Sequence, residues 1–474
     1  MKPRELINLG FSEGPAIGEI VRAAERALAG GVASDEILER LRLLREDPSA
    51  LSNDTYFGVA ADMILQDTRL ERYIFREAGQ ARSMFDIWGE ERIDAGAIDQ
   101  MVNAMRLPVA VAGALMPDAH VGYGLPIGGV LATEGAVIPY AVGVDIACRM
   151  MLSVLPINAS TTEPDPIKKL ESEFVRVIER NTRFGAGAKF TGRDRREAPV
   201  LDEDWNITDI TKKMKPTACE QLGTSGGGNH FVDVGELEFA EDYKGVPAGR
   251  YVAILTHSGS RGPGARTCDF YSRLAQSLHP RLPKEYRHLA WLLLDRPEGL
   301  EYWAAMELMG RFASANHHCI HETILRDMNM SPILQVENHH NFAWKEVHGG
   351  REVIVHRKGA TPAGAGVLGV IPGSMAAPGF LVEGMGRHSS LDSAAHGAGR
   401  QFSRKKAKET FSWDPVRKLL GERRVRLMSA GLDEVPGAYK PIEDVMAAQR
   451  DLVRVVARFE PRIVKMADDG FAED

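Results

Sequence analysis

Hydrophobic positions recur at helical spacing in the first part of the chain. Residues 15–29 (PAIGEIVRAAERALA) carry apolar side chains three and four positions apart, and the pattern stops at the glycine pair 30–31. Residues 34–47 (SDEILERLRLLRED) repeat it, with Ser34 or Asp35 as the expected N-cap. We therefore expect a helical hairpin in roughly the first 50 residues, followed by a bridging stretch. The pattern favours a docking or packing appendage.

After Met84 the chain changes to short runs that are rich in β-branched residues. Those typical of strands are residues 128–133 (GGVLAT), 251–257 (YVAILTH), 351–357 (REVIVHR) and 366–372 (GVLGVIP). Helical spacing returns in residues 165–181 and 442–459, where we expect helices. We therefore predict a mixed α/β fold of the α+β type, with an N-terminal helical extension over residues 1–80 and one large domain over residues 81–474.

The composition excludes some classes of protein. The chain has 474 residues, of which 44% are hydrophobic and 26% charged, as in ordinary globular proteins. A formal net charge of −7 argues against non-specific coating of nucleic acid, although it allows a local basic groove. No apolar run is long enough to span a membrane, and the N-terminus lacks the apolar core of a signal peptide. The cysteines form no CxxC pair, so we expect reduced thiols and a cytoplasmic location.

Histidine, cysteine and aspartate recur in loops beside glycine or asparagine. In chain order the groups are Asp118 with His120, Asp145 with Cys148, Asn229 with His230 and Asp233, His257 with Arg261, and His339 with His340 and Asn341. Imidazole, thiolate and carboxylate are the side chains that bind borderline divalent ions. One such histidine alone is more often a core or surface residue, but several at strand ends favour a metal site. Zinc, cobalt or manganese suits these ligands better than magnesium or calcium.

A histidine among small residues is the candidate nucleophile. His396 lies in the stretch HGAGR, where glycine and alanine leave its imidazole accessible, and Arg400 follows four residues later. A neutral ring nitrogen can attack phosphorus, and a planar guanidinium can hold the same phosphate. An exposed loop histidine without a catalytic role is equally compatible with this pattern.

Two further features suit phosphate groups. Residues 223–230 (GTSGGGNH) and 257–264 (HSGSRGPG) can present backbone N–H groups to an anion, although simple turns also explain them and neither has P-loop spacing. Residues 180–196 and 400–408 interleave arginine and lysine with phenylalanine. That mixture suits a nucleic-acid backbone with base stacking, and a solvated charged surface is the alternative.

The ordered combination of motifs is more specific than any one of them. From about residue 83 to 466 the chain resembles the RtcB family of RNA ligases. The motifs that carry the resemblance are MPDAHVGYGLPIGGVLAT (116–133), VGVDIACRM (142–150), LGTSGGGNHF (222–231), HSGSRGPG (257–264), HHN (339–341), HRKGAT (356–361), IPGSM (371–375) and HGAGR (396–400). The resemblance implies a single large catalytic domain with mixed sheets around a central metal cleft. It also implies GTP- and manganese-dependent joining of RNA 3′-phosphate or 2′,3′-cyclic phosphate ends to 5′-hydroxyl ends.

The resemblance further assigns roles to individual residues. His396 would take GMP from GTP and pass it to the RNA 3′-phosphate. Cys148 would bridge two manganese ions, with Asp145 and His230 on one and His257 and His340 on the other. The nucleotide contacts would be Asn229, Asp233, Lys358, Ser374, His396, Arg400 and Lys465, with Arg261 near the reacting phosphates and Asp118 and Asn341 lining the site. RNA ends would be the partners, and the resemblance leaves open whether the small activator archease is needed.

The sequence departs from the family pattern in several places. Arg149 stands where members usually carry glycine, and Asp233 stands where glutamate is expected. The chain also continues beyond Lys465, and the N-terminal helical segment is extra. These departures keep other functions open. The first is an enzyme that caps 3′-phosphate ends of RNA or DNA without joining them, the next a non-catalytic RNA-binding paralogue, and the last a metallohydrolase.

Overall fold

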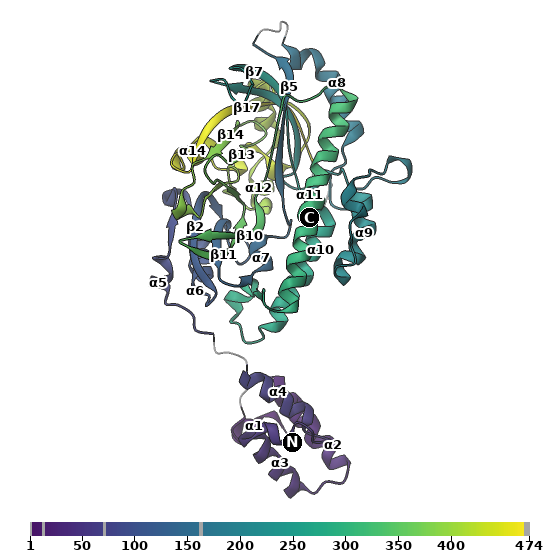
Figure 1. Ribbon diagram of the computed structural model, residues 1–474, viewed down its shortest axis with the longest axis vertical. Coiled ribbons are helices and arrows are strands. Elements are labelled where there is room, and N and C mark those ends of the chain that lie inside the picture. Colours follow the sequence, from purple (N-terminus) through teal and green to yellow (C-terminus); the bar gives the residue numbers. More distant parts are fainter. Residues whose placement is uncertain (1, 12–14, 70–72, 161–164, 469–474) are drawn as a thin grey trace. The chain divides into compact units, whose positions relative to one another are not determined.

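The computed structural model of the protein describes residues 2–11, 15–69, 73–160 and 165–468, so most of the tail noted beyond Lys465 lies outside it. The chain forms two compact units, Met1–Ile74 and Phe75–Asp474 (Figure 1). Among the helices of the described residues, none combines the length and the apolar character needed to cross a membrane.

The N-terminal unit is a small helical domain. Its helices are α1 (Pro3–Asn8), α2 (Pro15–Ala29), α3 (Ser34–Glu46), the short 3-10 helix η1 (Pro48–Leu51) and α4 (Gly58–Arg69). Leu6, Ile20, Leu41 and Phe57 are buried in its core. The expected hairpin corresponds to α2 and α3, but α4 lies in the stretch that the sequence treated as a bridge. The N-cap of α3 is Ala33, without a side-chain cap, so the prediction of Ser34 or Asp35 was wrong.

The larger unit is built on two mixed sheets. The smaller sheet has the strand order β1-β2-β3-β11-β10, with bounds β1 (Phe85–Ile87), β2 (Ala110–His120), β3 (Ile127–Thr133), β10 (Asn341–His348) and β11 (Arg351–Lys358). The larger sheet has the order β13-β14-β17-β6-β7-β5-β9, with β16 added beside β17; its bounds are β5 (Arg149–Asn158), β6 (Phe231–Phe239), β7 (Gly249–Ser258), β9 (Leu334–His339), β13 (Leu368–Ile371), β14 (Gly379–Gly384), β16 (Arg426–Ser429) and β17 (Val453–Met466). Two short pairs complete the strands: β4 (Ala136–Val137) with β8 (Leu292–Leu293), and β12 (Ala360–Pro362) with β15 (Ser393–Ala395).

Helices cover these sheets. The α-helices of the larger unit are α5 (Ala78–Arg82), α6 (Ala95–Arg106), α7 (Pro139–Val142), α8 (Pro166–Asn181), α9 (Asp209–Gln221), α10 (Arg261–Leu278), α11 (Pro297–Asp327), α12 (Arg404–Thr410), α13 (Trp413–Glu422) and α14 (Ile442–Ala448). The 3-10 helices are η2 (Glu90–Arg92), η3 (Gly192–Asp194), η4 (Pro199–Asp202), η5 (Lys284–Leu289), η6 (His388–Ser390), η7 (Leu432–Glu434) and η8 (Pro436–Ala438). The long helix α11 lies beside α10 (Figure 1), and Tyr271, Tyr302 and Phe312 of these two helices are fully buried. Helix α11 also packs on the larger sheet, because its Ile320 and Ile324 share a buried cluster with Val232 of β6 and Val252 of β7.

Most of the elements predicted from hydrophobic spacing are present. The four predicted strands correspond to β3, β7, β11 and β13, and the helix predicted at 165–181 is α8, capped by the side chain of Asp165. The helix predicted over 442–459 was wrong in its second half, because α14 ends at Ala448 and β17 follows. Strand β17 pairs with β14 on one side and β6 on the other. This pairing satisfies the backbone of a segment whose apolar residues also fit helical spacing. The predicted mixed α+β class is confirmed.

Candidate metal centre and nucleotide cleft

Strand ends from both sheets meet at one place. Cys148 directly precedes β5, His230 directly precedes β6, and His257 lies at the end of β7. In the sheet register His257 is opposite both Met150 and Phe231. His340 is the single residue between β9 of the larger sheet and β10 of the smaller one. The topology therefore gathers side chains that lie far apart in the sequence.

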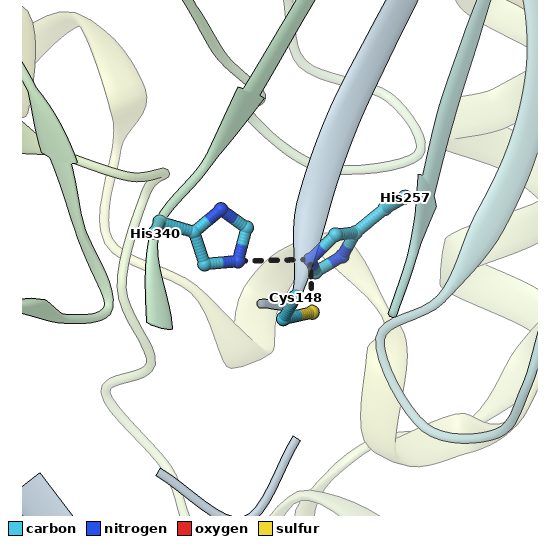
Figure 2. A group of neighbouring side chains, drawn as sticks. All are labelled: Cys148, His257 and His340. Atoms are coloured by element: carbon cyan, nitrogen blue, oxygen red, sulfur yellow. Dashed lines mark hydrogen bonds between the residues drawn. The ribbon is translucent and has the colours of Figure 1, made fainter. Parts of the chain in front are cut away.

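The gathered side chains form what we call the cleft cluster: Asp145, Cys148, His230, His257 and His340. It contains two groups of three that share Cys148, namely Cys148–His257–His340 and Asp145–Cys148–His230, and within each group the ligand atoms lie within 4.8 Å of one another. Cys148 Sγ is 3.1 Å from His257 Nε2 and 3.4 Å from His230 Nε2. His257 Nε2 is 3.2 Å from His340 Nε2, and His230 Nε2 is 3.1 Å from Asp145 Oδ2. Figure 2 shows the first group, whose ring nitrogens point toward the sulfur and toward one another.

Burial sets the protonation of the cleft cluster. Burial, reinforced by the neighbouring His230, lowers the pKa of His257 to about 3, so its imidazole is neutral at physiological pH. Burial raises the pKa of the Cys148 thiol, and the carboxylate of Asp145 raises it further. Burial also acts to raise the pKa of Asp145, but His230 and Arg261 outweigh it and hold that pKa well below its ordinary value. Burial likewise lowers the pKa of His340 well below its ordinary value. Neutral imidazoles at His257 and His340, an ionised carboxylate and a thiol that a nearby cation would ionise together fit a pair of divalent metal ions.

Tight backbone packing holds the cleft cluster in place. Gly226 has φ +113, and a Cβ there would lie 2.1 Å from Nδ1 of His230. Ala147 and Arg261 also have positive φ, of 57° and 55°, although neither is glycine. The buried Arg261 guanidinium contacts Nδ1 of His230 at 3.3 Å and the Thr224 hydroxyl at 3.3 Å. Arg261 therefore lies directly beside one ligand group.

His396 is held by a buried carboxylate next to this centre. It follows β15, and its Nδ1 lies 2.6 Å from Oδ2 of the fully buried Asp118. The same oxygen accepts the backbone N–H groups of His396 and Gly397 at 3.1 and 3.3 Å. Because a carboxylate accepts hydrogen bonds, the neutral form of this ring carries its proton on Nδ1 and its lone pair on Nε2. The His396 ring is 4.9 Å from the ring of His340 between centroids, so the free nitrogen lies close to the cleft cluster.

Neighbouring residues fix Asp118 and the segment beside the metal ligands. Lys440 donates to the carbonyl oxygens of Pro117 and Ala119 at 3.0 and 2.8 Å, on either side of Asp118. Asn341 bridges two parts of the site, since its amide nitrogen donates to the Asp145 carbonyl at 3.3 Å and its oxygen accepts from the Gly359 N–H at 2.8 Å. Asp118 therefore contacts His396, and Asn341 contacts the backbone of Asp145.

A cavity of about 310 Å³ opens beside His396. Among the residues named from the sequence, it is lined by His120, Asn229, Asp233, His257, Ser374, His396 and Arg400. Burial raises the pKa of Asp233 well above its ordinary value, although the Lys465 backbone N–H acts in the opposite direction. Burial therefore favours the neutral form of this carboxyl group on the cavity wall.

Four residues of the cavity region were missed by the sequence analysis as functional candidates. Arg404, Glu434 and Tyr439 line the cavity, and Asp433 lies beside them. Glu434 contacts Arg400, Arg404 and the Tyr439 hydroxyl, and Asp433 accepts from Arg404 at 2.9 Å. The stretch GLDEVPGAYK shows no spacing that links its acids to the arginines, and only the basic run at 400–408 hinted at this group.

Two lysines that were predicted to contact the nucleotide have other partners in the structure. Lys358 donates to the carbonyl oxygens of Tyr123 and Leu125 at 2.6 and 3.0 Å, and burial lowers its pKa to about 8. The Lys465 amine lies over the ring of Phe184, 5.6 Å from its centroid. Neither lysine is among the residues that line the cavity.

The basic run at 180–196 does not offer the aromatic surface that base stacking needs at Phe190. That ring is 2% exposed. The guanidinium groups of Arg183 and Arg196 lie over it at 4.8 and 4.7 Å from its centroid. The ring is used within the protein, so the stacking interpretation was wrong for this phenylalanine.

The side chain of Arg149 turns away from the cleft cluster. Its guanidinium donates to Glu337 of β9 at 2.8 Å and to the Gly310 carbonyl of α11 at 3.4 Å, and Nε donates to the Ala147 carbonyl at 3.2 Å. Only 6% of the Arg149 side chain is exposed. The extra cation is therefore neutralised within the protein and does not project among the metal ligands.

The fold and the site define a mixed α/β protein with a cluster of one thiol, three imidazoles and a carboxylate near a cavity. The sequence profile described as tRNA-splicing ligase RtcB matches residues 100–466. The chain therefore belongs to the RtcB family.

Curated relatives agree with this membership. The chain is 35% identical over 400 residues to the RNA-splicing ligase RtcB of Escherichia coli K12, covering 77% of this chain and 92% of that protein. It is 32% identical over 426 residues to the RNA-splicing ligase RtcB of Mycobacterium tuberculosis, covering 76% and 98%. It is 30% identical over 442 residues to the tRNA-splicing ligase RtcB of Thermococcus kodakarensis, covering 77% and 89%.

Proposed function

We propose that the protein is a GTP- and manganese-dependent RNA ligase that joins 3′-phosphate or 2′,3′-cyclic phosphate ends to 5′-hydroxyl ends. The observation that carries the proposal is the Asp118–His396 pair, which leaves Nε2 of His396 free between the cavity and the cleft cluster. Membership of a family whose curated relatives are named RNA ligases supports the same reaction. The four cysteines are free, which supports a cytoplasmic location.

The proposed first step is transfer of GMP to the protein. Nε2 of His396 attacks the α-phosphorus of GTP, a P–N bond forms, and the bond to pyrophosphate breaks. The proton stays on Nδ1, where Asp118 accepts it in a 2.6 Å hydrogen bond and stabilises the positive ring as it forms. Asp118 therefore sets the tautomer that makes His396 a nucleophile.

The later steps use the same histidine as a leaving group. An oxygen of the RNA 3′-phosphate attacks the phosphorus of the adduct, and His396 leaves with its lone pair restored. The 5′-hydroxyl then attacks the activated 3′-phosphate, and GMP leaves as the phosphodiester forms. A 2′,3′-cyclic end must first be opened by water, because only the monophosphate carries the oxygen that attacks.

The cleft cluster would hold the two manganese ions. Cys148 would be shared, with Asp145 and His230 on one ion and His257 and His340 on the other, as the two groups of three are arranged. Bound ions would supply neutralisation of phosphate charge. The thiolate and imidazoles also suit zinc, so the metal that binds most tightly can differ from the metal that supports activity.

The cavity would receive the guanine nucleotide. Asn229, Asp233, Ser374 and Arg400 line it and would contact the nucleotide directly, while Arg261 lies beside the ligand group of His230. Asp233 would have to give up its proton to accept the N–H groups of guanine. Lys358 and Lys465 would reach the nucleotide only after leaving their present partners.

The test is formation of a covalent GMP adduct. Purified protein is incubated with labelled GTP and manganese, and the adduct is followed by denaturing gel and intact mass. The wild type should acquire one acid-labile GMP, and His396→Ala should acquire none. His318→Ala, which changes a half-exposed histidine of α11, is the matched control and should label normally. Labelling of His396→Ala would overturn the assignment.

A second assay separates joining from capping. RNA with a 3′-phosphate is offered together with 5′-hydroxyl RNA, with and without archease, and in parallel with DNA ends. A ligated RNA product supports the proposal. Accumulation of a guanylylated 3′ end without joining, under all of these conditions, would replace it with an end-capping activity.

A further inference from the structure

A second group of metal-ligating side chains lies outside the cleft. We call it the edge cluster: His348, His388 and Asp392, whose ligand atoms all lie within 4.8 Å of one another. His348 is the last residue of β10, the outer strand of the smaller sheet. His388 begins η6, and Asp392 directly precedes β15. The three residues therefore join a strand end to the loop that leads to His396.

The side chains of the edge cluster are graded in exposure. His348 is 11% exposed, Asp392 25% and His388 89%. Nδ1 of His388 lies 3.4 Å from Oδ1 of Asp392, and this oxygen is buried without a hydrogen-bond donor among the residues that the structure describes. The buried oxygen of Asp392 and the two imidazoles together form a possible ligand set for a metal ion. The exposed His388 leaves one side of this set open to solvent.

Surrounding charges favour a cation at this position. Glu346 accepts from Nε2 of His348 at 2.7 Å, as carboxylates commonly do behind metal-bound imidazoles. The nearby Arg357 is neutralised by Glu346, through contacts of 2.6 and 3.1 Å. Arg387 is directed to Asp451 at 3.8 Å. Arg357 and Arg387 are thus paired with carboxylates other than Asp392, so the negative charge of Asp392 can attract a metal cation.

The loop that carries Asp392 is built to a fixed shape. Leu391 and Asp392 both have left-handed backbone, with φ of 52° and 49°. The buried Arg357 guanidinium donates to the Leu391 carbonyl at 2.8 Å and to the Ser393 hydroxyl at 2.8 Å. The backbone around Asp392 is therefore set by contacts of Arg357 and does not depend on the ligand side chains.

We propose that the edge cluster binds one zinc-class divalent transition metal ion, with His348, His388 and Asp392 as ligands. Two imidazoles and a carboxylate suit an ion of this class, and water can fill the open side of the coordination sphere. The ion would tie the end of β10 to the residue before β15, and so brace the segment that ends at His396. The proposal does not depend on the reaction proposed above.

The test counts zinc in full-length protein. Protein is saturated with zinc(II) chloride, desalted, and its metal content is measured by mass spectrometry, in the wild type and in His388→Gln, Asp392→Asn and the control His318→Gln. His388 is exposed, and asparagine tolerates left-handed backbone, so both cluster variants should fold, which circular dichroism checks. Each cluster variant should lose about one zinc per chain, and the control should lose none.

Cobalt distinguishes the two clusters. Cobalt(II) bound at Cys148 gives a thiolate charge-transfer absorption, whereas cobalt on imidazole and carboxylate gives only d–d bands. His388→Gln should lose the d–d intensity of one cobalt and keep the thiolate band. Cys148→Ala should lose the thiolate band and keep the d–d bands of the edge cluster. Equal zinc content in wild type, His388→Gln and Asp392→Asn would overturn the proposal. Loss of the thiolate band in His388→Gln would also overturn it, because the metal lost would then belong to the cleft.

Discussion

The cleft cluster and the edge cluster use similar side chains in opposite surroundings. In the cleft, Cys148, His257 and His340 are buried where strand ends of two sheets meet. At the edge, His388 is almost fully exposed and no thiolate takes part. Burial lowers the pKa values of His257 and His340, so both imidazoles are neutral, and it raises the pKa of Cys148, so a cation favours the thiolate. The comparison teaches that placement, more than residue type, separates a buried cluster suited to the proposed chemistry from an exposed one suited to bracing a loop.

Removing Cys148, which both groups of the cleft cluster share, should have the largest effect on activity. Cys148→Ala takes one ligand from both groups of the cleft cluster, so both ions should bind poorly. We expect GMP-adduct formation to fall by about 10⁴-fold, with circular dichroism unchanged. Adduct yield and bound manganese are the measurements. Full labelling by Cys148→Ala would show that the cleft cluster is not the catalytic metal centre.

The carboxylate behind His396 should matter nearly as much. Asp118→Asn places an amide against Nδ1, and an amide N–H would favour the tautomer whose proton sits on Nε2. The adduct-forming rate should fall by about 10²- to 10³-fold while the dissociation constant for GTP stays within about twofold. Single-turnover labelling gives the rate, and GTP titration gives the affinity. If the adduct-forming rate and the GTP affinity fell by the same factor, Asp118 would have a structural role instead.

The raised pKa of Asp233 predicts a pH dependence of GTP binding. Guanine N–H groups bind the ionised carboxylate, so binding lowers the pKa of Asp233 and releases its proton. Affinity should therefore increase with pH, by up to about tenfold per unit, between the pKa in the complex and the higher pKa of the free protein. GTP titrations across pH test this. Asp233→Asn should bind weakly with a flat profile, and an unchanged profile in that variant would exclude Asp233 as the source.

A change at Arg149 should have the smallest effect, and that effect should be on the stability of the fold. Arg149→Met would leave Glu337 without its buried partner, although Glu337 is 24% exposed and water can compensate in part. We expect the free energy of unfolding to fall by about 2 kcal/mol, with adduct formation retained. Denaturant unfolding measures it. Combining Arg149→Met with Glu337→Gln should cost less than the sum of the single changes, and simple additivity would contradict the pairing.

Local elements could be predicted where one hydrophobic spacing dominated. The strands at 128–133 and 351–357 are short runs that contain β-branched residues, and they appear as β3 and β11. Residues 442–459 satisfied helical spacing as well, and the register of β17 between β14 and β6 decided the matter. The motifs also pointed to Cys148 and His396 as candidates, and the structure places Cys148 in the cleft cluster and His396 beside Asp118. Contacts of Glu434 with Arg400 and Arg404 could not be predicted, because no local pattern connects them.

The sequence by itself determined which chemistry is available: a thiolate, imidazoles and carboxylates in glycine loops, and a histidine among small residues. It also determined the local helices and most strands, because hydrophobic spacing acts over a few residues. Tertiary structure alone decided which potential ligands lie together in the cleft, where Arg149 points, and that His348, His388 and Asp392 meet. These outcomes depend on strand register and burial, which bring together residues far apart in the chain and set their charges.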